Sequence, residues 1–221
     1  MRHVRLMITV FAVLCSVQGT MVAQQIMNVQ GNPIPGVAGY GVELGLDGSG
    51  NVAALLVYKG TKLAQELVVC TPQPVPRNGD IGTIATTDLN FDGYGDLLLQ
   101  VSSKDNNATF CVWLFDPKTQ QYIASPALSQ LVNPRADPAT KEVTAYKNMG
   151  CRGSCYEKQI YTWIKGQLTM TRDETVTRNI EAPTGDAGGC GFVRSVKELR
   201  KGQLTEIGRD VVNDVGAVCY P

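Results

Sequence analysis

Apolar and polar residues alternate along most of this chain with a period of two. Val42, Leu44 and Leu46 alternate with polar or small residues, and a DGSGN turn separates them from the apolar run NVAALLVYK. Similar short runs follow, separated by clusters of Gly, Pro, Asn and Asp. Alternation bounded by turn residues is typical of half-buried strands joined by hairpins. The pattern therefore predicts an all-β protein, an antiparallel β-sandwich without βαβ units.

Two segments fit this pattern less well. SPALSQLVNPRADP, from residue 125 to 138, has the composition of a helical turn. FVRSVKELRKG, from residue 192 to 202, fits either a short strand or one amphipathic helix. Short apolar runs do not separate these two conformations by periodicity alone.

The N-terminal residues predict export. Arg2 and Arg5 precede an apolar stretch of 12 residues, Leu6–Val17, which small and polar residues follow. This is the pattern of a secretory signal peptide, and the stretch is too short to span a membrane. We expect a signal peptide at 1–23, a flexible leader at 24–39 and a single domain at 40–221, of which 181–221 forms a C-terminal extension. The protein is then periplasmic or secreted, with no stable membrane span.

Loss of the signal peptide removes His3, which is the only histidine. Without histidine the mature chain has neither a Ser-His-Asp triad nor a Cys-His pair. A glycosidase would need two spaced carboxylates, and the adjacent pair Asp173–Glu174 is better explained as structural. Loss of Arg2 and Arg5 leaves 18 basic and 20 acidic residues, a net charge of −2, with no basic stripe for nucleic acid. The sequence therefore predicts a binding protein rather than an enzyme.

Cysteine residues indicate stabilisation by disulfides. The six that follow the signal peptide are Cys70, Cys111, Cys151, Cys155, Cys190 and Cys219. In an exported chain such residues are first interpreted as disulfides. Cys151 and Cys155, in CRGSC, are the local candidates for a pair or for the ends of a constrained loop, and Cys190 and Cys219 could join the C-terminal part. The sequence alone leaves the connectivity open.

The segment DLNFDGYGD, from Asp88 to Asp96, has the spacing of a calcium loop. Calcium takes six to eight oxygen ligands in flexible geometry. Side-chain oxygens of Asp88, Asn90 and Asp92, the Tyr94 carbonyl, and Asp96 directly or through water are the candidate ligands, and Gly93 permits the bend. An EF-hand would require Glu at its twelfth position, which here is Leu99. We therefore expect a calcium site between two strands; a solvated polar turn is the alternative.

Longer motifs carry a resemblance to known families. DLNFDGYGDLLL resembles the calcium loop of FG-GAP or VCBS-type modules. It is followed in order by CVWLFDPKTQQY, by SPALSQLVNPRADPATKEVTAY and by GSCYEKQIYTWIKGQLTMTRDE. Together these resemble exported bacterial proteins related to the periplasmic inhibitors of invertebrate-type lysozyme. Some members are immunity proteins against lysozyme-like effectors of type IV secretion. The resemblance covers about residues 40 to 180.

The resemblance implies a calcium-stabilised sandwich with a protruding loop that enters the cleft of a lysozyme-like peptidoglycan hydrolase. Carried onto this chain, the loop is Gly150–Tyr156. Gly153 and Ser154 would shape its tip, Tyr156 would supply a large rigid contact, and Arg152 could pair with a carboxylate of the partner. This chain departs from the simpler loop by placing Cys151 and Cys155 around it. A stapled turn without a partner, with Tyr156 packed in the sheet, is the alternative for the loop. A calcium-stabilised adhesion or carbohydrate-binding module is the alternative function.

Overall fold

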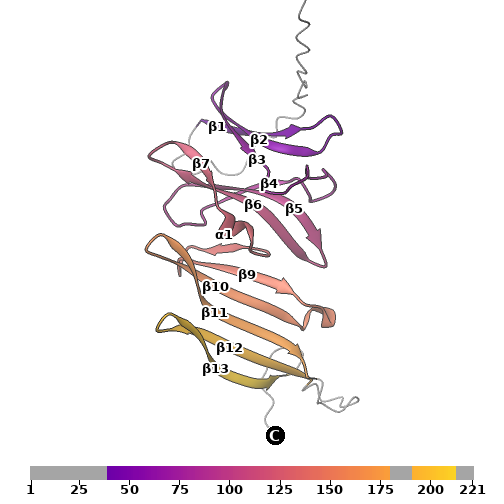
Figure 1. Cartoon of the computed structure of the whole chain (residues 1–221), viewed down its shortest axis with the longest axis vertical. Helices are drawn as coiled ribbons and strands as arrows, with labels where there is room; N and C mark the ends of the chain where they lie inside the picture. Colours follow the sequence, from indigo (N-terminus) through magenta and orange to yellow (C-terminus); the bar gives the residue numbers. More distant parts are fainter. Residues whose placement is uncertain (1–38, 180–190, 213–221) are drawn as a thin grey trace, which may run out of the picture.

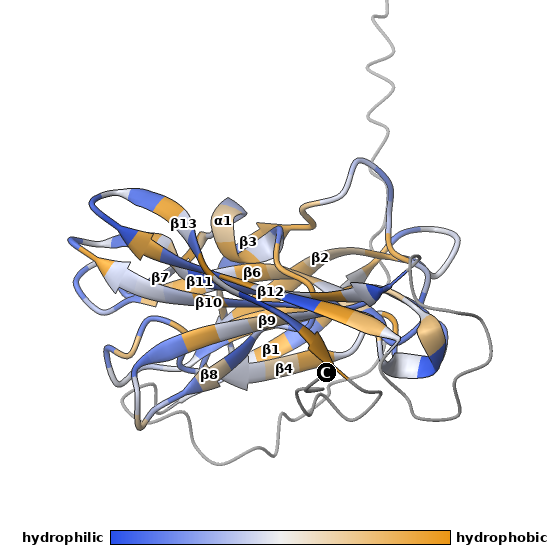
Figure 2. Ribbon diagram, turned by 90° about the horizontal axis from the view of Figure 1, so that it is seen from below, coloured by the Kyte–Doolittle hydropathy of each residue, from blue (hydrophilic) through white to orange (hydrophobic). Residues whose placement is uncertain are grey.

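The computed structural model describes residues 39–179 and 191–212, and these residues form three antiparallel sheets. Figure 1 shows the sheets following one another along the long axis of the molecule in chain order. The prediction of an antiparallel all-β fold is confirmed. In Figure 2 the turns between strands are mostly hydrophilic, as expected of turns that face solvent.

The first sheet is a three-stranded meander. Its strands are β1 (Tyr40–Leu46), β2 (Val52–Lys59) and β3 (Lys62–Val68). Alternate residues of β1 point inward, so that Val42 and Leu44 are buried while Gly41 is exposed. The meander therefore has one apolar face that must be covered.

A second sheet covers that face. Its strands are β4 (Ile84–Thr87), β5 (Asp96–Lys104), β6 (Asn107–Asp116) and β7 (Gln121–Ala124), and the short helix α1 (Pro126–Ser129) follows. Both sheets contribute to one core, with Leu44 and Leu55 from the first and Leu97, Leu99 and Trp113 from the second. This pair of sheets is the predicted β-sandwich.

The second sheet is buried on its other face too. Leu98 and Val112 point away from the first core and join Leu128 of α1 and Val143 in a second core. A strand covered on both faces has a continuous apolar run instead of alternation. The second core therefore explains the run Leu97–Leu99.

A third sheet of six strands lies against the second core. Its strands are β8 (Arg135–Asp137), β9 (Glu142–Asn148), β10 (Tyr156–Ile164), β11 (Gln167–Arg178), β12 (Phe192–Arg200) and β13 (Gln203–Val212), with the 3₁₀ turn η1 (Cys151–Gly153) before β10. Tyr161 and Trp163 of β10 and Leu168 of β11 pack against the second core. Segment 192–202 is thus a strand and turn, because β11 and β13 pair with it on both sides.

Candidate functional site

Segment Asp88–Asp96 forms the loop between β4 and β5. Phe91 and Gly93 adopt positive φ angles of 60° and 88°, which bend the chain tightly. Glycine takes such angles without strain because it lacks a Cβ. The loop thus has the sharp turn at Gly93 that its sequence predicts.

The side-chain oxygens of this loop converge on its own backbone. Asp88 accepts hydrogen bonds from the N–H groups of Asp92 (3.2 Å) and Gly93 (2.9 Å). Asn90 Oδ1 also accepts from the Asp92 N–H (3.2 Å), and Asp92 Oδ1 accepts from the Tyr94 N–H (2.9 Å). Within the described ranges no group of three or more His, Cys, Asp and Glu side chains is placed to hold a metal ion. The donor set of this loop is two carboxylates, one amide and a carbonyl, all oxygens of the kind that calcium takes.

The contacts of Asp96 differ from those of Asp88, Asn90 and Asp92. Asp96 is fully buried, and its two oxygens accept hydrogen bonds from the N–H groups of Leu89 (2.7 Å) and Phe115 (3.0 Å). Burial raises the pKa of Asp96 to about 7, and the nearby charges of Asp92 and Asp88 add to the rise against the two N–H bonds. Asp96 therefore fastens the end of the loop to β6.

Trp163 fastens the same loop to the third sheet. Its indole Nε1 donates a hydrogen bond of 2.8 Å to the carbonyl of Leu89, which is buried. Sequence reasoning did not find this bond. The bond joins residues 74 positions apart, so local pattern carries no signal for it.

The loop CRGSC is closed by a disulfide between Cys151 and Cys155, which confirms the local pair. Gly150, Arg152 and Gly153 take positive φ angles of 97°, 57° and 96°, and Arg152 is exposed. The loop is therefore a tight, cross-linked turn that presents one cation.

The base of this stapled loop is tied to the β5–β6 turn. The Asn107 side-chain amide donates to the Asn148 carbonyl (2.9 Å), and the Asn148 N–H donates back to Asn107 Oδ1 (2.7 Å). The Asn148 side chain also donates to the Asp105 carbonyl (3.0 Å). Residues of both turns, among them Asp105, Met149 and Arg152, line a cavity of about 640 Å³.

Tyr156 begins β10 and lies on a face of the sheet, next to the stapled loop in sequence. Its ring stacks on Tyr146 at 5.4 Å between centroids, and its hydroxyl donates to Glu174 at 2.6 Å. Burial and the bond to Glu174 raise the pKa of Tyr156 to about 12. Tyr156 is half-buried, as in the alternative in which it packs within the sheet.

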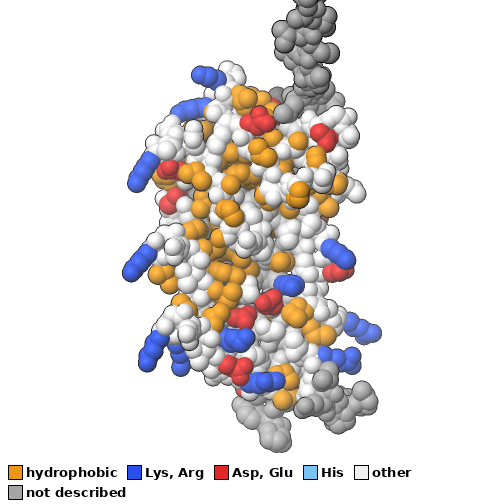
Figure 3. All heavy atoms as spheres, viewed as in Figure 1, with side chains coloured by type: hydrophobic (Ala, Val, Ile, Leu, Met, Phe, Trp, Pro, Cys, Tyr) orange, Lys and Arg blue, Asp and Glu red, His pale blue; other side chains and the backbone are white. Residues whose placement is uncertain are grey.

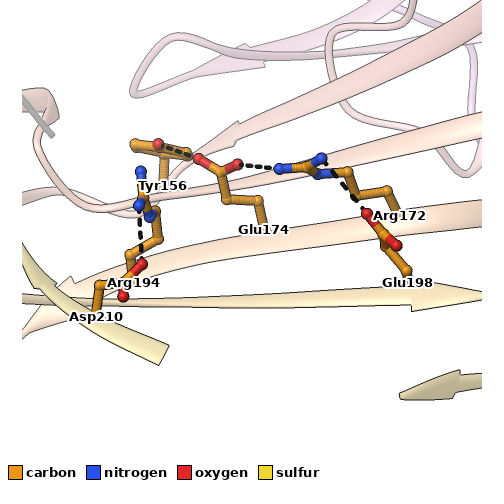
Figure 4. Close-up of polar contacts among 6 residues, drawn as sticks. All are labelled: Tyr156, Arg172, Glu174, Arg194, Glu198 and Asp210. Atoms are coloured by element: carbon orange, nitrogen blue, oxygen red, sulfur yellow. Dashed lines mark hydrogen bonds and ion pairs between the residues drawn. The ribbon is translucent and has the colours of Figure 1, made fainter. Parts of the chain in front are cut away.

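Charged side chains continue from Tyr156 across this face of the third sheet. Glu174 lies 3.5 Å from Arg172, and Arg172 lies 3.7 Å from Glu198. Arg194 pairs with Asp210 at 2.8 Å (Figure 4). Sequence reasoning missed this network, because its members come from four consecutive strands, β10 to β13, and the exact register of these strands decides which side chains meet.

The second disulfide joins Cys70 to Cys111, with a sequence separation of 41. It connects the segment after β3 to β6, and so links the two sheets of the sandwich. Cys190 and Cys219 lie outside the described residues.

A cleft of about 650 Å³ opens beside the Asp88–Asp96 loop. Asn90 and Asp92 of that loop line it, together with Asp116 from the end of β6, Trp163 from β10 and Gln167 from β11. Figure 1 shows the β6–β7 and β10–β11 turns on the same side of the molecule. The stapled loop, residues 151–155, and this cleft lie at opposite ends of β10.

Comparison with known proteins supports the fold. No protein-family model matches the chain, and no curated protein matches it in sequence. A solved structure described as a Xanthomonas type IV secretion system related protein is similar in fold. It shares 16% identity and covers 85% of this chain and 98% of its own, with a TM-score of 0.50. At this identity the likeness establishes the fold alone. Within residues 39–179 and 191–212, no helix has the length and apolar character needed to cross a membrane.

Proposed function

We propose that this protein is a calcium-binding periplasmic inhibitor, or immunity protein, of a lysozyme-like peptidoglycan hydrolase. It blocks the enzyme by inserting the stapled loop into the active-site cleft. The observation that carries the proposal is the geometry of this loop, in which a disulfide and a tied base hold one exposed arginine at a tight turn. A pre-organised loop loses little conformational entropy when it binds.

The residues around the loop have the composition of an interface. Arg152, Met149 and Tyr146 are exposed. Arg, Met and Tyr are enriched where proteins bind one another. Arg152 is suited to a bidentate contact with a carboxylate in the hydrolase cleft. Tyr156 follows the loop directly and is held in the sheet by its stack with Tyr146 and its bond to Glu174.

Two further observations support the proposal. The structural neighbour is described as related to a type IV secretion system, the setting in which immunity proteins of the resembled family act. Both described disulfides suit the oxidising periplasm. Asp88, Asn90, Asp92 and the Tyr94 carbonyl would hold calcium, which would keep the loop before β5 rigid.

Inhibition of wall lysis tests the proposal. The protein is mixed with a panel of lysozyme-like hydrolases, including any encoded beside it, and turbidity of a peptidoglycan suspension is followed. We expect potent inhibition of one enzyme and a loss of about tenfold or more for Arg152→Ala, because truncation of an interface anchor costs about 2 kcal/mol or more.

Lys165→Ala is the matched control. Lys165 is an exposed cation with a positive φ of 50°, in the turn at the opposite end of β10. This variant should inhibit like the wild type. Unchanged lysis across the panel contradicts the proposal, and equal inhibition by the Arg152 and Lys165 variants contradicts the assigned loop.

A further inference from the structure

The cleft beside the Asp88–Asp96 loop has the chemistry of a sugar site. Its volume of about 650 Å³ lies within the range of small-molecule sites. Trp163, Leu114 and Ile123 contribute apolar surface, and Asp116 and Gln167 contribute polar groups. A pyranose ring combines an apolar face with hydroxyl groups at its edge, and so it matches both kinds of lining.

Trp163 is held in place before any ligand arrives. Its indole N–H already donates to the Leu89 carbonyl, and its ring packs against the second core. The orientation of the ring is therefore determined by the fold. An aromatic wall of this kind loses no rotamer freedom when an apolar face stacks on it.

The Asp116 carboxylate favours ligands that donate hydrogen bonds to it. Asp116 accepts from the Lys118 N–H (2.9 Å) and the Thr119 hydroxyl (2.8 Å), and these bonds lower the pKa of its carboxyl group. It is thus a carboxylate at neutral pH, and each of its oxygens keeps further acceptor capacity. None of the described residues that line the cleft is Lys or Arg, which disfavours phosphate or carboxylate ligands.

We propose that this cleft binds one or two rings of a neutral glycan, with Trp163 as the stacking surface and with Asp116 and Gln167 as the hydroxyl-binding groups. On the face of the molecule that Figure 3 shows, apolar side chains gather over the upper and middle part, and Lys and Arg side chains lie along the left edge and over the lower part. The proposal is independent of hydrolase inhibition, because the stapled loop lies at the other end of β10. Together the two sites would let one protein hold a glycan strand and an enzyme at once.

Tryptophan fluorescence provides a direct test. The chain has two tryptophans, and Trp113 is buried in the first core at 3% exposure. In a Trp113→Phe background the signal reports on Trp163 alone. Chitotetraose, cellotetraose and maltotetraose are titrated in turn, with calorimetry on the wild type as a second measurement. We expect saturable binding of at least one of them.

The variants Asp116→Asn and Gln167→Ala should each weaken that binding about tenfold, because a lost hydrogen bond to a ligand costs about 1.4 kcal/mol. Asp137→Asn is the matched control: Asp137 accepts a backbone N–H two residues ahead, as Asp116 does, but lies before β9. All three variants should inhibit a hydrolase like the wild type, so failure here is distinguishable from failure of the proposed function. No binding up to about 10 mM, equal binding by the variants, or binding of tetramethylammonium in place of sugars would overturn the proposal.

Discussion

At the residue scale, Asp96 is the most consequential side chain of the Asp88–Asp96 loop. Its position in DLNFDGYGD predicts a calcium ligand, whereas its contacts in the structure are two backbone N–H groups in a buried setting. A buried carboxylate loses its hydration, and this cost appears as a raised pKa of about 7. Asp96 therefore anchors the loop in the core, and its protonation should make the stability of the fold depend on pH.

We expect stability in chelator to fall as pH rises from about 4 to 7. In this window the unfolded Asp96 is already ionised while the folded Asp96 still holds its proton, so the folded state binds more protons. The loss is on the order of 4 kcal/mol at most, and no further loss is expected above pH 7. Denaturant melts across this range measure it. Asp96→Asn, which cannot titrate, is the control; identical slopes for both proteins would refute the assignment.

At the element scale, the two disulfides constrain different parts of the structure. Cys70–Cys111 closes a long segment and links the two sheets of the sandwich, whereas Cys151–Cys155 closes only the turn before β10. A cross-link restricts the unfolded chain more when the closed loop is longer. The first disulfide thus contributes mainly to stability, and the second mainly to the shape of the stapled loop.

Removal of each disulfide should separate these effects. Cys70→Ala with Cys111→Ala should lower the free energy of unfolding by about 4 kcal/mol, and Cys151→Ala with Cys155→Ala by about 2 kcal/mol. Hydrolase inhibition, measured below the unfolding transition, should drop only in the second pair. Chemical denaturation and lysis assays provide the two measurements. A larger loss of inhibition in the Cys70–Cys111 variant would contradict this division.

At the scale of the whole molecule, the Asp88–Asp96 loop connects the second sheet to the third. It lies between β4 and β5 of the middle sheet, Asp96 ties it to β6, and Trp163 ties it to the third sheet. Both cores therefore depend on its conformation. A cation that binds this loop only in the folded state stabilises the whole protein by mass action.

Calcium at about 100 times its dissociation constant should add about 2.7 kcal/mol to the free energy of unfolding, and chelator should remove this gain. Thermal melts with and without calcium check this, alongside calorimetric titration. Asp88→Asn with Asp92→Asn should abolish the gain. Asp47→Asn should keep it, since Asp47 makes similar bonds to backbone N–H groups in the DGSGN turn, which we interpret as a plain hairpin turn. A gain that survives in the double variant would rule out this site.

Much of the fold was predictable because it depends on local periodicity. Alternation in β1 and β2 and turn residues between strands specify hairpins whose partners are adjacent in the chain. The pair Cys151–Cys155 was predictable for the same reason, since its members are four residues apart. The conformation of segment 192–202 was not predictable in this way, because only its pairing with β11 and β13 makes it a strand.

The sequence by itself determined the all-β class, the bend at Gly93 and the stapled loop, since each follows from the conformational preferences of neighbouring residues. Only the tertiary structure decided that Cys70 joins Cys111, that Asp96 bonds to the Phe115 N–H, and that Trp163 bonds to the loop carbonyl of Leu89. These contacts join distant parts of the chain through sheet packing and strand register. Local sequence carries no information about them, because each contact forms only once the strands have paired or the sheets have packed.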